Sequence, residues 1–149
     1  MMRDSGFLAL ALAGAIVLAS CRGSARPPHP AGAWNPNSIQ WQPADSDGTK
    51  WAVLEGRTDA PDAFTYAYFV PAGHWEHHSH TADARVAVIS GALRVSYGDH
   101  LDSTTAQVYP AGSFLLVPAN APHTMGATTN TIIIGTAVGP WKTHYAHTH

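Results

Sequence analysis

Short hydrophobic runs, separated by turn-forming residues, fill the chain between about residue 51 and residue 138. Valine, isoleucine, threonine, tyrosine and phenylalanine recur in these runs, which is typical of β-strands. Nowhere in this region do apolar residues follow the helical spacing for three turns. The pattern therefore predicts an all-β fold with strands at residues 51–55, 63–70, 85–90, 92–97, 106–109, 113–117 and 131–138.

Glycine, proline, asparagine and aspartate separate the predicted strands. Clear turn signals are Pro71-Ala72-Gly73, Pro110-Ala111-Gly112 and Pro118-Ala119-Asn120. Many short strands at such spacing favour a β-sandwich or a barrel, and jelly-roll closure would leave few free sheet edges. The Trp and Tyr side chains of residues 51–56 and 63–70 are expected to pack in the core or to form a cavity wall.

Residues 1–20 have the pattern of a secretory signal peptide. Arg3 supplies a positive charge, and residues 7–18 are uncharged but too few to span a bilayer core of about 30 Å. A Leu-Ala-Ser-Cys sequence follows, which resembles the lipobox of bacterial lipoproteins. The resemblance implies that Cys21 is lipidated and that Arg22 directs the protein to the periplasmic face of the outer membrane. The alternative is an ordinary signal peptide with an incidental cysteine.

The segment after the signal peptide, residues 21–38, is rich in proline, glycine and serine and has no periodic apolar face. Such a composition is typical of a tether. The predicted organisation is a signal peptide at 1–20, a lipidated N-terminus with a tether at 21–38, and one folded domain at 39–149. About 110 residues suffice for one hydrophobic core and are too few for two domains.

Composition narrows the classes of function. With eight Lys plus Arg against ten Asp plus Glu among 149 residues, the net charge is −2, which argues against a nucleic-acid partner. A single cysteine excludes an intrachain disulfide and a cysteine-based zinc finger. No serine-hydrolase elbow, phosphate-binding loop or dinucleotide fingerprint is present. The unusual feature is the ten histidines, because imidazole is the commonest metal ligand.

Four of these histidines and one glutamate fall within residues 74–80, with the sequence HWEHHSH. Side chains alternate along an extended chain, so Glu76, His78 and His80 would share one face with His74, while His77 faces the other way. His78 and His80 would then form a two-imidazole claw on one strand.

Two imidazoles bind a divalent ion only modestly, so a useful site needs a third ligand and a pocket that limits solvent. His123 is the candidate for this third ligand. It follows a proline-framed turn, Pro118 to Pro122, which comes after an apolar run and would hold the side chain in place. The expected metal ligands are therefore His78, His80 and His123.

These two segments resemble the two sequence motifs of cupins, the RmlC-like jelly-roll family. The residues that carry the resemblance are Gly73, His78, His80 and Gly91 in the first motif and Gly112, Pro118 and His123 in the second. Further similarity to a group of small cupins lies in Ala82-Asp83-Ala84-Arg85 and Gly139-Pro140-Trp141. The resemblance covers nearly all of residues 51–145. It implies a double-stranded β-helix, a small barrel that holds one divalent transition metal.

The main departure from the family pattern is Ala84, which occupies the position of the family's metal-binding glutamate. Asn120 in place of a turn glycine is a milder change, because asparagine tolerates the left-handed conformation. Three outcomes are open: a site of three neutral imidazoles with open positions, a site in which Glu76 or Asp83 replaces the carboxylate, or a pocket without a catalytic metal. The ion would be iron, zinc, manganese, nickel or copper, since imidazoles accept several first-row metals.

Two further features each have two interpretations. Arg85 would either hold a carboxylate of the substrate or face solvent from the outer side of its strand. His144, His147 and His149 would form either an accessory metal-loading segment or a frayed terminus.

Together these patterns suggest a lipid-anchored metal-binding cupin that acts on or binds a small molecule inside its barrel. The family analogy implies an oxygenase-like or isomerase-like reaction. A non-catalytic lipoprotein that senses a small ligand or a metal is the competing class, and a structural barrel used for homodimer contacts is a third.

Overall fold

Ten β-strands and no helix form residues 32–146, the part of the chain that this computed structural model describes. The predicted all-β jelly-roll fold class is confirmed. The lipidation candidate Cys21 and the histidines at 147 and 149 lie outside the described residues. Within residues 32–146, no helix is long and apolar enough to cross a membrane. The strands are β1 (Lys50–Glu55), β2 (Ala63–Val70), β3 (Trp75–His80), β4 (Ala84–Ser90), β5 (Ala92–Tyr97), β6 (Gln107–Pro110), β7 (Phe114–Val117), β8 (His123–Ala127), β9 (Thr131–Val138) and β10 (Thr143–Tyr145).

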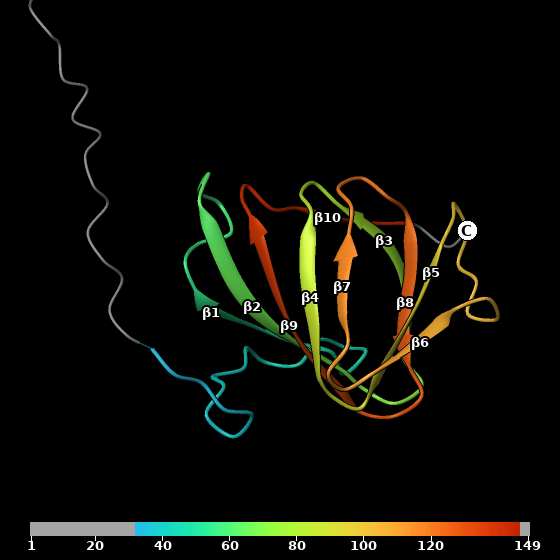
Figure 1. Cartoon of the computed structure of the whole chain (residues 1–149), viewed down its shortest axis with the longest axis horizontal. Coiled ribbons are helices and arrows are strands. Elements are labelled where there is room, and N and C mark those ends of the chain that lie inside the picture. Colours follow the sequence, from blue (N-terminus) through green and yellow to red (C-terminus); the bar gives the residue numbers. More distant parts are fainter. Residues whose placement is uncertain (1–31, 147–149) are drawn as a thin grey trace, which may run out of the picture. The chain divides into compact units, whose positions relative to one another are not determined.

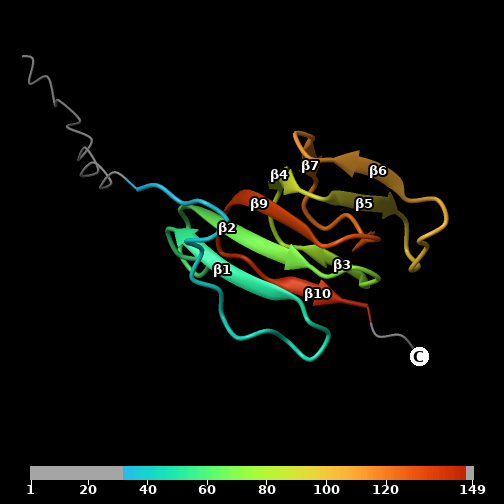
Figure 2. The ribbon, with the colours of Figure 1, turned by 90° about the horizontal axis from the view of Figure 1, so that it is seen from below.

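The strands form two five-stranded antiparallel sheets, with the orders β1-β2-β9-β4-β7 and β10-β3-β8-β5-β6 (Figure 1). Most neighbours within a sheet are distant in sequence; β9, for example, pairs with both β2 and β4. Seen from below, β1 and β10 lie toward one edge of the fold and β6 and β7 toward the other (Figure 2). Because the chain crosses between the sheets, β3, which carries His78 and His80, lies beside β8, which begins at His123.

The seven strands predicted from the hydrophobic pattern are all present, each within one residue of its predicted ends. The pattern missed β3, β8 and β10. The inward face of β3 is imidazole and not aliphatic, so it lacks the usual apolar signal. Strand β8 is buried along its whole length and contains Gly126, so its sequence does not alternate. Strand β10 has only three residues.

The core lies between the two sheets, where inward-facing side chains alternate with outward-facing ones. On β4, for example, Val86 and Val88 are buried while Arg85 and Ile89 are exposed. Close packing also fixes the aromatic side chains: Gly135 on β9 lies under the ring of Tyr66, and a Cβ at this position would overlap that ring. The main core cluster consists of Val70, Ala84, Val86, Val88, Leu93, Val95, Leu115, Val117, Met125, Ala127 and Ile133.

Two phenylalanines provide a matched test of this core. Phe64 on β2 is 1% exposed and packs edge-on against Trp141, whereas Phe114 on β7 is 67% exposed. Replacing Phe64 with Ala is expected to lower the free energy of unfolding by about 3–5 kcal/mol, because it opens a cavity in the core. The same change at Phe114 is expected to cost about 0.5 kcal/mol or less. Urea unfolding measures both, and equal losses for the two variants would contradict the assigned core.

Candidate metal centre

The register between β3 and β8 brings the three singled-out histidines together. His78 on β3 lies directly opposite His123 on β8. Their ring centroids are 4.4 Å apart, and the ring of His80 lies 4.8 Å from each of them. One ring nitrogen from each of the three residues lies within 4.8 Å of the others. Two distant segments of the chain thus supply one cluster of imidazoles.

Side chains alternate along β3, so His77 faces away from His78 and His80. His78 and His80 point into the barrel, and the Nε2 atoms of the two rings are 2.9 Å apart. His77 points to the other face, where its Nδ1 lies 3.2 Å from the hydroxyl of Thr124. The alternation expected from the sequence is therefore present in β3, although this segment was not among the predicted strands.

The turn before β8 fixes the orientation of His123. Asn120 adopts the left-handed conformation, with φ of 58°, which agrees with the expectation for an asparagine in place of a turn glycine. Its backbone N–H donates a hydrogen bond of 2.7 Å to the carbonyl of His80, which attaches the turn to the end of β3. The Nδ1 of His123 lies 2.9 Å from the carbonyl of Ala121 and donates to it, which leaves Nε2 as a free lone pair.

The spacing of these nitrogens fits a first-row metal ion. Two imidazole nitrogens bound at about 2.1 Å, with an angle of about 90° at the ion, would lie about 3.0 Å apart. The 2.9 Å between the Nε2 atoms of His78 and His80 is close to this value. The Nδ1 atoms of the same two residues are buried and have no hydrogen-bond partner among the described residues. The three imidazoles could therefore hold one ion and leave the remaining coordination positions open.

The electrostatic surroundings keep these imidazoles neutral. Burial, with help from the neighbouring histidines, lowers the pKa of His78 to about 2. Burial and the proximity of His123 lower the pKa of His80 to about 3. Burial also lowers the pKa of His123. The neutral form is the one that binds metals, so no proton has to be removed at neutral pH.

A cavity of about 300 Å³ adjoins the three histidines. The ring of Trp141 stacks on that of His80, with centroids 4.3 Å apart, and Trp51 stacks on Tyr66 at the same distance. Among the described residues, no Lys or Arg lines this cavity, and Asp45 is its one carboxylate. The aromatic wall consists of Trp51, Tyr66, Tyr68, Trp141 and Tyr145.

The wall confirms the interpretation of the Trp and Tyr side chains in residues 51–56 and 63–70 as core or cavity wall. Trp141 and Tyr145 come from the C-terminal segment, where the sequence offered only the Gly-Pro-Trp resemblance as a signal. Tyr145 reaches the cavity because it pairs with His78 across β10 and β3.

Neither candidate carboxylate is part of the histidine cluster. Glu76 lies behind His78, with Oε1 3.7 Å from Nδ1 of that residue and the hydroxyl of Tyr68 donating to its carboxylate at 3.3 Å. Asp83 is exposed, and its carboxylate accepts a 2.8 Å hydrogen bond from the backbone N–H of Ala119. Asp83 therefore stabilises the turn that precedes β8.

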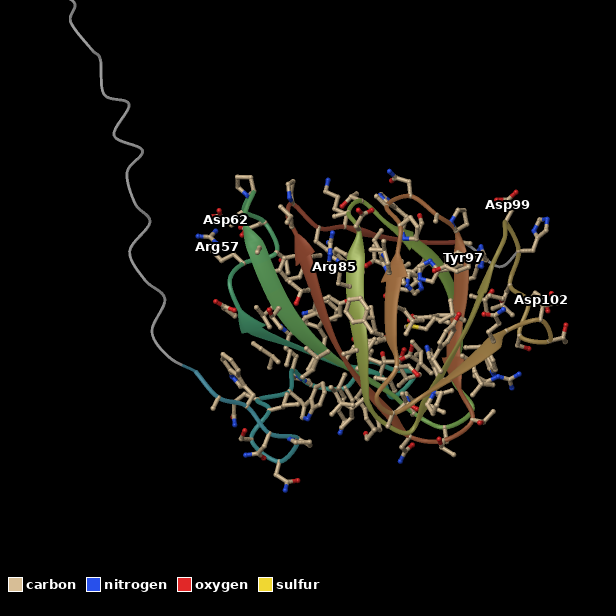
Figure 3. All side chains as sticks on the ribbon, in the orientation of Figure 1. Arg57, Asp62, Arg85, Tyr97, Asp99 and Asp102 are labelled. Carbon is tan, nitrogen blue, oxygen red and sulfur yellow. The ribbon has the colours of Figure 1, made fainter. Side chains whose placement is uncertain are left out.

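The remaining candidates lie outside the cavity. Arg85 is exposed on the outer face of β4 (Figure 3), between the buried residues Ala84 and Val86. It does not line the cavity, so the solvent-facing interpretation agrees with the structure. Ala84 is fully buried and shares the inward face of β4 with Val86. His144 is exposed on β10, opposite Ser79.

Several solved structures are similar to this fold. KdgF from Halomonas sp. is 15% identical, with a TM-score of 0.56 over 72% of this chain and 94% of that chain. An RmlC-like cupin from Shewanella frigidimarina is 20% identical, with a TM-score of 0.55 over 70% and 87%. Salicylate 1,2-dioxygenase from Pseudoaminobacter salicylatoxidans, in complex with gentisate, is 17% identical, with a TM-score of 0.58 over 72% and 32%. Likeness at these identities shows the fold alone.

No curated protein sequence matches this chain. A family model described as "ChrR Cupin-like domain" matches residues 31–142, which is more than half of the chain. The matched region contains both histidine segments and the strands that carry them. The chain therefore belongs to the family of ChrR cupin-like domains.

Proposed function

We propose that this protein is a metal-dependent cupin that binds one divalent transition-metal ion through His78, His80 and His123 and acts on a small molecule in the adjacent cavity. The observation that carries the proposal is the convergence of three buried, neutral imidazoles at the wall of a cavity. The Nε2 atoms of His78 and His80 lie 2.9 Å apart at the centre of the cluster, and a bound ion would accept the lone pairs of both.

A three-imidazole site leaves positions at the ion open for water and substrate. When bound, the ion supplies a Lewis acid or, for a redox-active metal such as iron, a centre for oxygen chemistry. The three ligands carry no charge, so the site favours an anionic oxygen donor such as an enolate or a carboxylate. This donor set supports an oxygenase-like or isomerase-like reaction.

The cavity itself limits the rest of the substrate. Its volume of about 300 Å³ is at the lower end of the range for ligand pockets, so the molecule must be small. The stacked rings of Trp51 and Tyr66, together with Trp141, offer flat apolar surfaces to an unsaturated body. Within the described part of the chain, no Lys or Arg lines the cavity to hold a second acidic group, so we propose a substrate with one oxygen-donor end and one planar apolar end.

A non-catalytic role in sensing or binding a small ligand is the second candidate. It is favoured by the cavity's tyrosines, which are poor proton acceptors. Burial raises the pKa of Tyr66. Burial and the nearby carboxylate of Glu76 also raise the pKa of Tyr68 and raise the pKa of Tyr145 to about 12. These tyrosines hold their protons at neutral pH and cannot act as bases. Turnover of any enolisable substrate, with or without oxygen uptake, separates the enzyme from the binder.

The location of the protein is also part of the proposal. The signal-like sequence at residues 1–20 and the lipobox resemblance support a lipid anchor on Cys21, which would hold the cupin domain at the periplasmic face of the outer membrane. The tether after Cys21 would then separate the domain from the bilayer.

The metal site is tested by elemental analysis of the full chain, purified without an affinity tag and loaded in turn with iron, zinc, manganese, nickel and copper. We expect one ion per chain for the wild type and loss of the ion in His78→Ala and His123→Ala. His144→Ala is the matched control, because this histidine is exposed and outside the cluster, and it is expected to keep the ion. A wild-type protein that binds none of the five metals would rule out the proposed function.

The pKa values of about 2 for His78 and about 3 for His80 also predict a pH dependence of the metal-free protein. The unfolded chain takes up protons on these imidazoles near pH 6.5, whereas the folded chain does not. The free energy of unfolding should therefore fall as the pH drops below about 6.5, by at most about 1.4 kcal/mol per pH unit for each group. Urea unfolding between about pH 7 and about pH 4 measures the slope. His78→Gln should show a shallower slope, and an unchanged one would contradict the assigned burial.

The anchor is tested by mass spectrometry and fractionation of cells that express the full chain. The mature wild-type protein is expected to begin at Cys21, to carry acyl chains and to sediment with membranes. Cys21→Ser should remain unacylated and leave the membrane fraction. A wild-type protein with an unmodified cysteine would support an ordinary signal peptide.

A further inference from the structure

Glu76 occupies a position that the proposed function does not yet use. Its side chain lies on the same face of β3 as His78 and is only 9% exposed. The Nε2 atom of His78 lies 2.9 Å from Nε2 of His80, within the cluster, while Nδ1 on the other side of the ring is 3.7 Å from Oε1 of Glu76. The carboxylate is thus placed behind one of the three imidazoles.

Two buried ring nitrogens that have no hydrogen-bond partner within residues 32–146 lie beside this carboxylate. One is Nδ1 of His78, and the other is Nε2 of His74, which is 3.7 Å from Oε2 of Glu76. The hydroxyl of Tyr68 lies 3.3 Å and 3.4 Å from the two carboxylate oxygens. The other ring nitrogen of His74, Nδ1, lies 3.7 Å from Oδ2 of Asp47. A shift of under 1 Å would therefore turn the contact between Glu76 and His78 into a hydrogen bond.

The charge balance of the cluster gives this contact a role. The family's metal-binding glutamate is replaced by Ala84, whose methyl group faces the interior. Three neutral imidazoles then contribute no negative charge to a dication. A carboxylate that accepts the N–H of a ligating imidazole makes the other nitrogen a stronger donor and fixes the tautomer of the ring. It also places a negative charge on the side of the His78 ring that is remote from the cluster.

We propose that Glu76 is a positioning residue for the metal site: its carboxylate accepts the Nδ1–H of His78 and supplies from behind this ligand the negative charge that Ala84 does not supply. This inference rests on the proposed function. It differs from the idea that Glu76 is a direct ligand, because the carboxylate acts through His78 and does not reach the cluster.

The test is the affinity of the full chain for zinc, measured by competition with a chromophoric chelator. Glu76→Gln keeps the size of the side chain and removes its charge, and we expect zinc to bind about 10- to 100-fold more weakly. Asp99→Asn removes one charge from an exposed residue in the loop after β5 (Figure 3) and should leave the affinity unchanged. Thermal unfolding of the metal-free variants checks that each is folded.

A second experiment tests whether a carboxylate at position 84 can replace the charge of Glu76 in zinc binding. Ala84→Glu is combined with Glu76→Gln, and we expect the added carboxylate to raise zinc affinity more in the Glu76→Gln background than in the wild type. The ligand-field spectrum of the cobalt-loaded protein should shift in Glu76→Gln and not in Asp99→Asn. If Glu76 had only a structural role, Glu76→Gln would not shift the spectrum. Ala84→Glu would then change zinc affinity equally in the wild type and in the Glu76→Gln background.

The failures of the two proposals are distinguishable. A wild type that binds no zinc overturns the proposed function. A wild type that binds zinc, together with a Glu76→Gln variant of equal affinity, overturns only the role of Glu76. Where Glu76→Gln does not fold, Glu76→Asp provides the measurement, since it withdraws the carboxylate from His78 and should weaken zinc binding several-fold. An unchanged affinity in that variant also overturns the inference.

Discussion

The candidate metal centre depends on the antiparallel pairing of β3 with β8. This pairing places His78 opposite His123, and the same row of the sheet continues to Tyr145 on β10 and Tyr97 on β5. Side chains alternate with a period of two along a strand, so a slip of one residue in β3 would turn His77 inward and both clustered histidines outward. The hydrogen bond from Asn120 to the carbonyl of His80 attaches the turn before β8 to the end of β3. The register is therefore fixed at the place where the site needs it.

Burial gives the cluster its chemical character and also makes it costly. Three imidazoles with exposed fractions of 4%, 7% and 1% lose most of their hydration, and the Nδ1 atoms of His78 and His80 find no hydrogen-bond partner among the described residues. The same burial keeps the rings neutral and ready to bind an ion. A fold that only needed stability would place aliphatic side chains here, as it does in the adjoining core. Packing alone thus does not explain the polar cluster, whereas the proposed metal binding would.

The sequence predicted the aliphatic strands well, because their apolar residues alternate or form short β-branched runs. It also predicted the grouping of His78 and His80 from strand parity and the third histidine from its turn. It could not decide the orientation of Arg85, since this depends on which face of β4 meets the other sheet. The placement of Glu76 behind His78 depends on side-chain packing between β2 and β3, which no local pattern encodes. The aromatic wall from Trp141 and Tyr145 depends on the return of β10 to the edge of β3.

X-ray absorption spectroscopy of the full chain loaded with one equivalent of zinc tests the central claim most directly. If the three imidazoles of the cluster bind the ion, the spectrum should contain imidazole scattering. Its best fit should have three nitrogen donors at about 2.0–2.1 Å, with oxygen in the remaining positions. A shell with one imidazole or none, or with sulfur, would contradict the account.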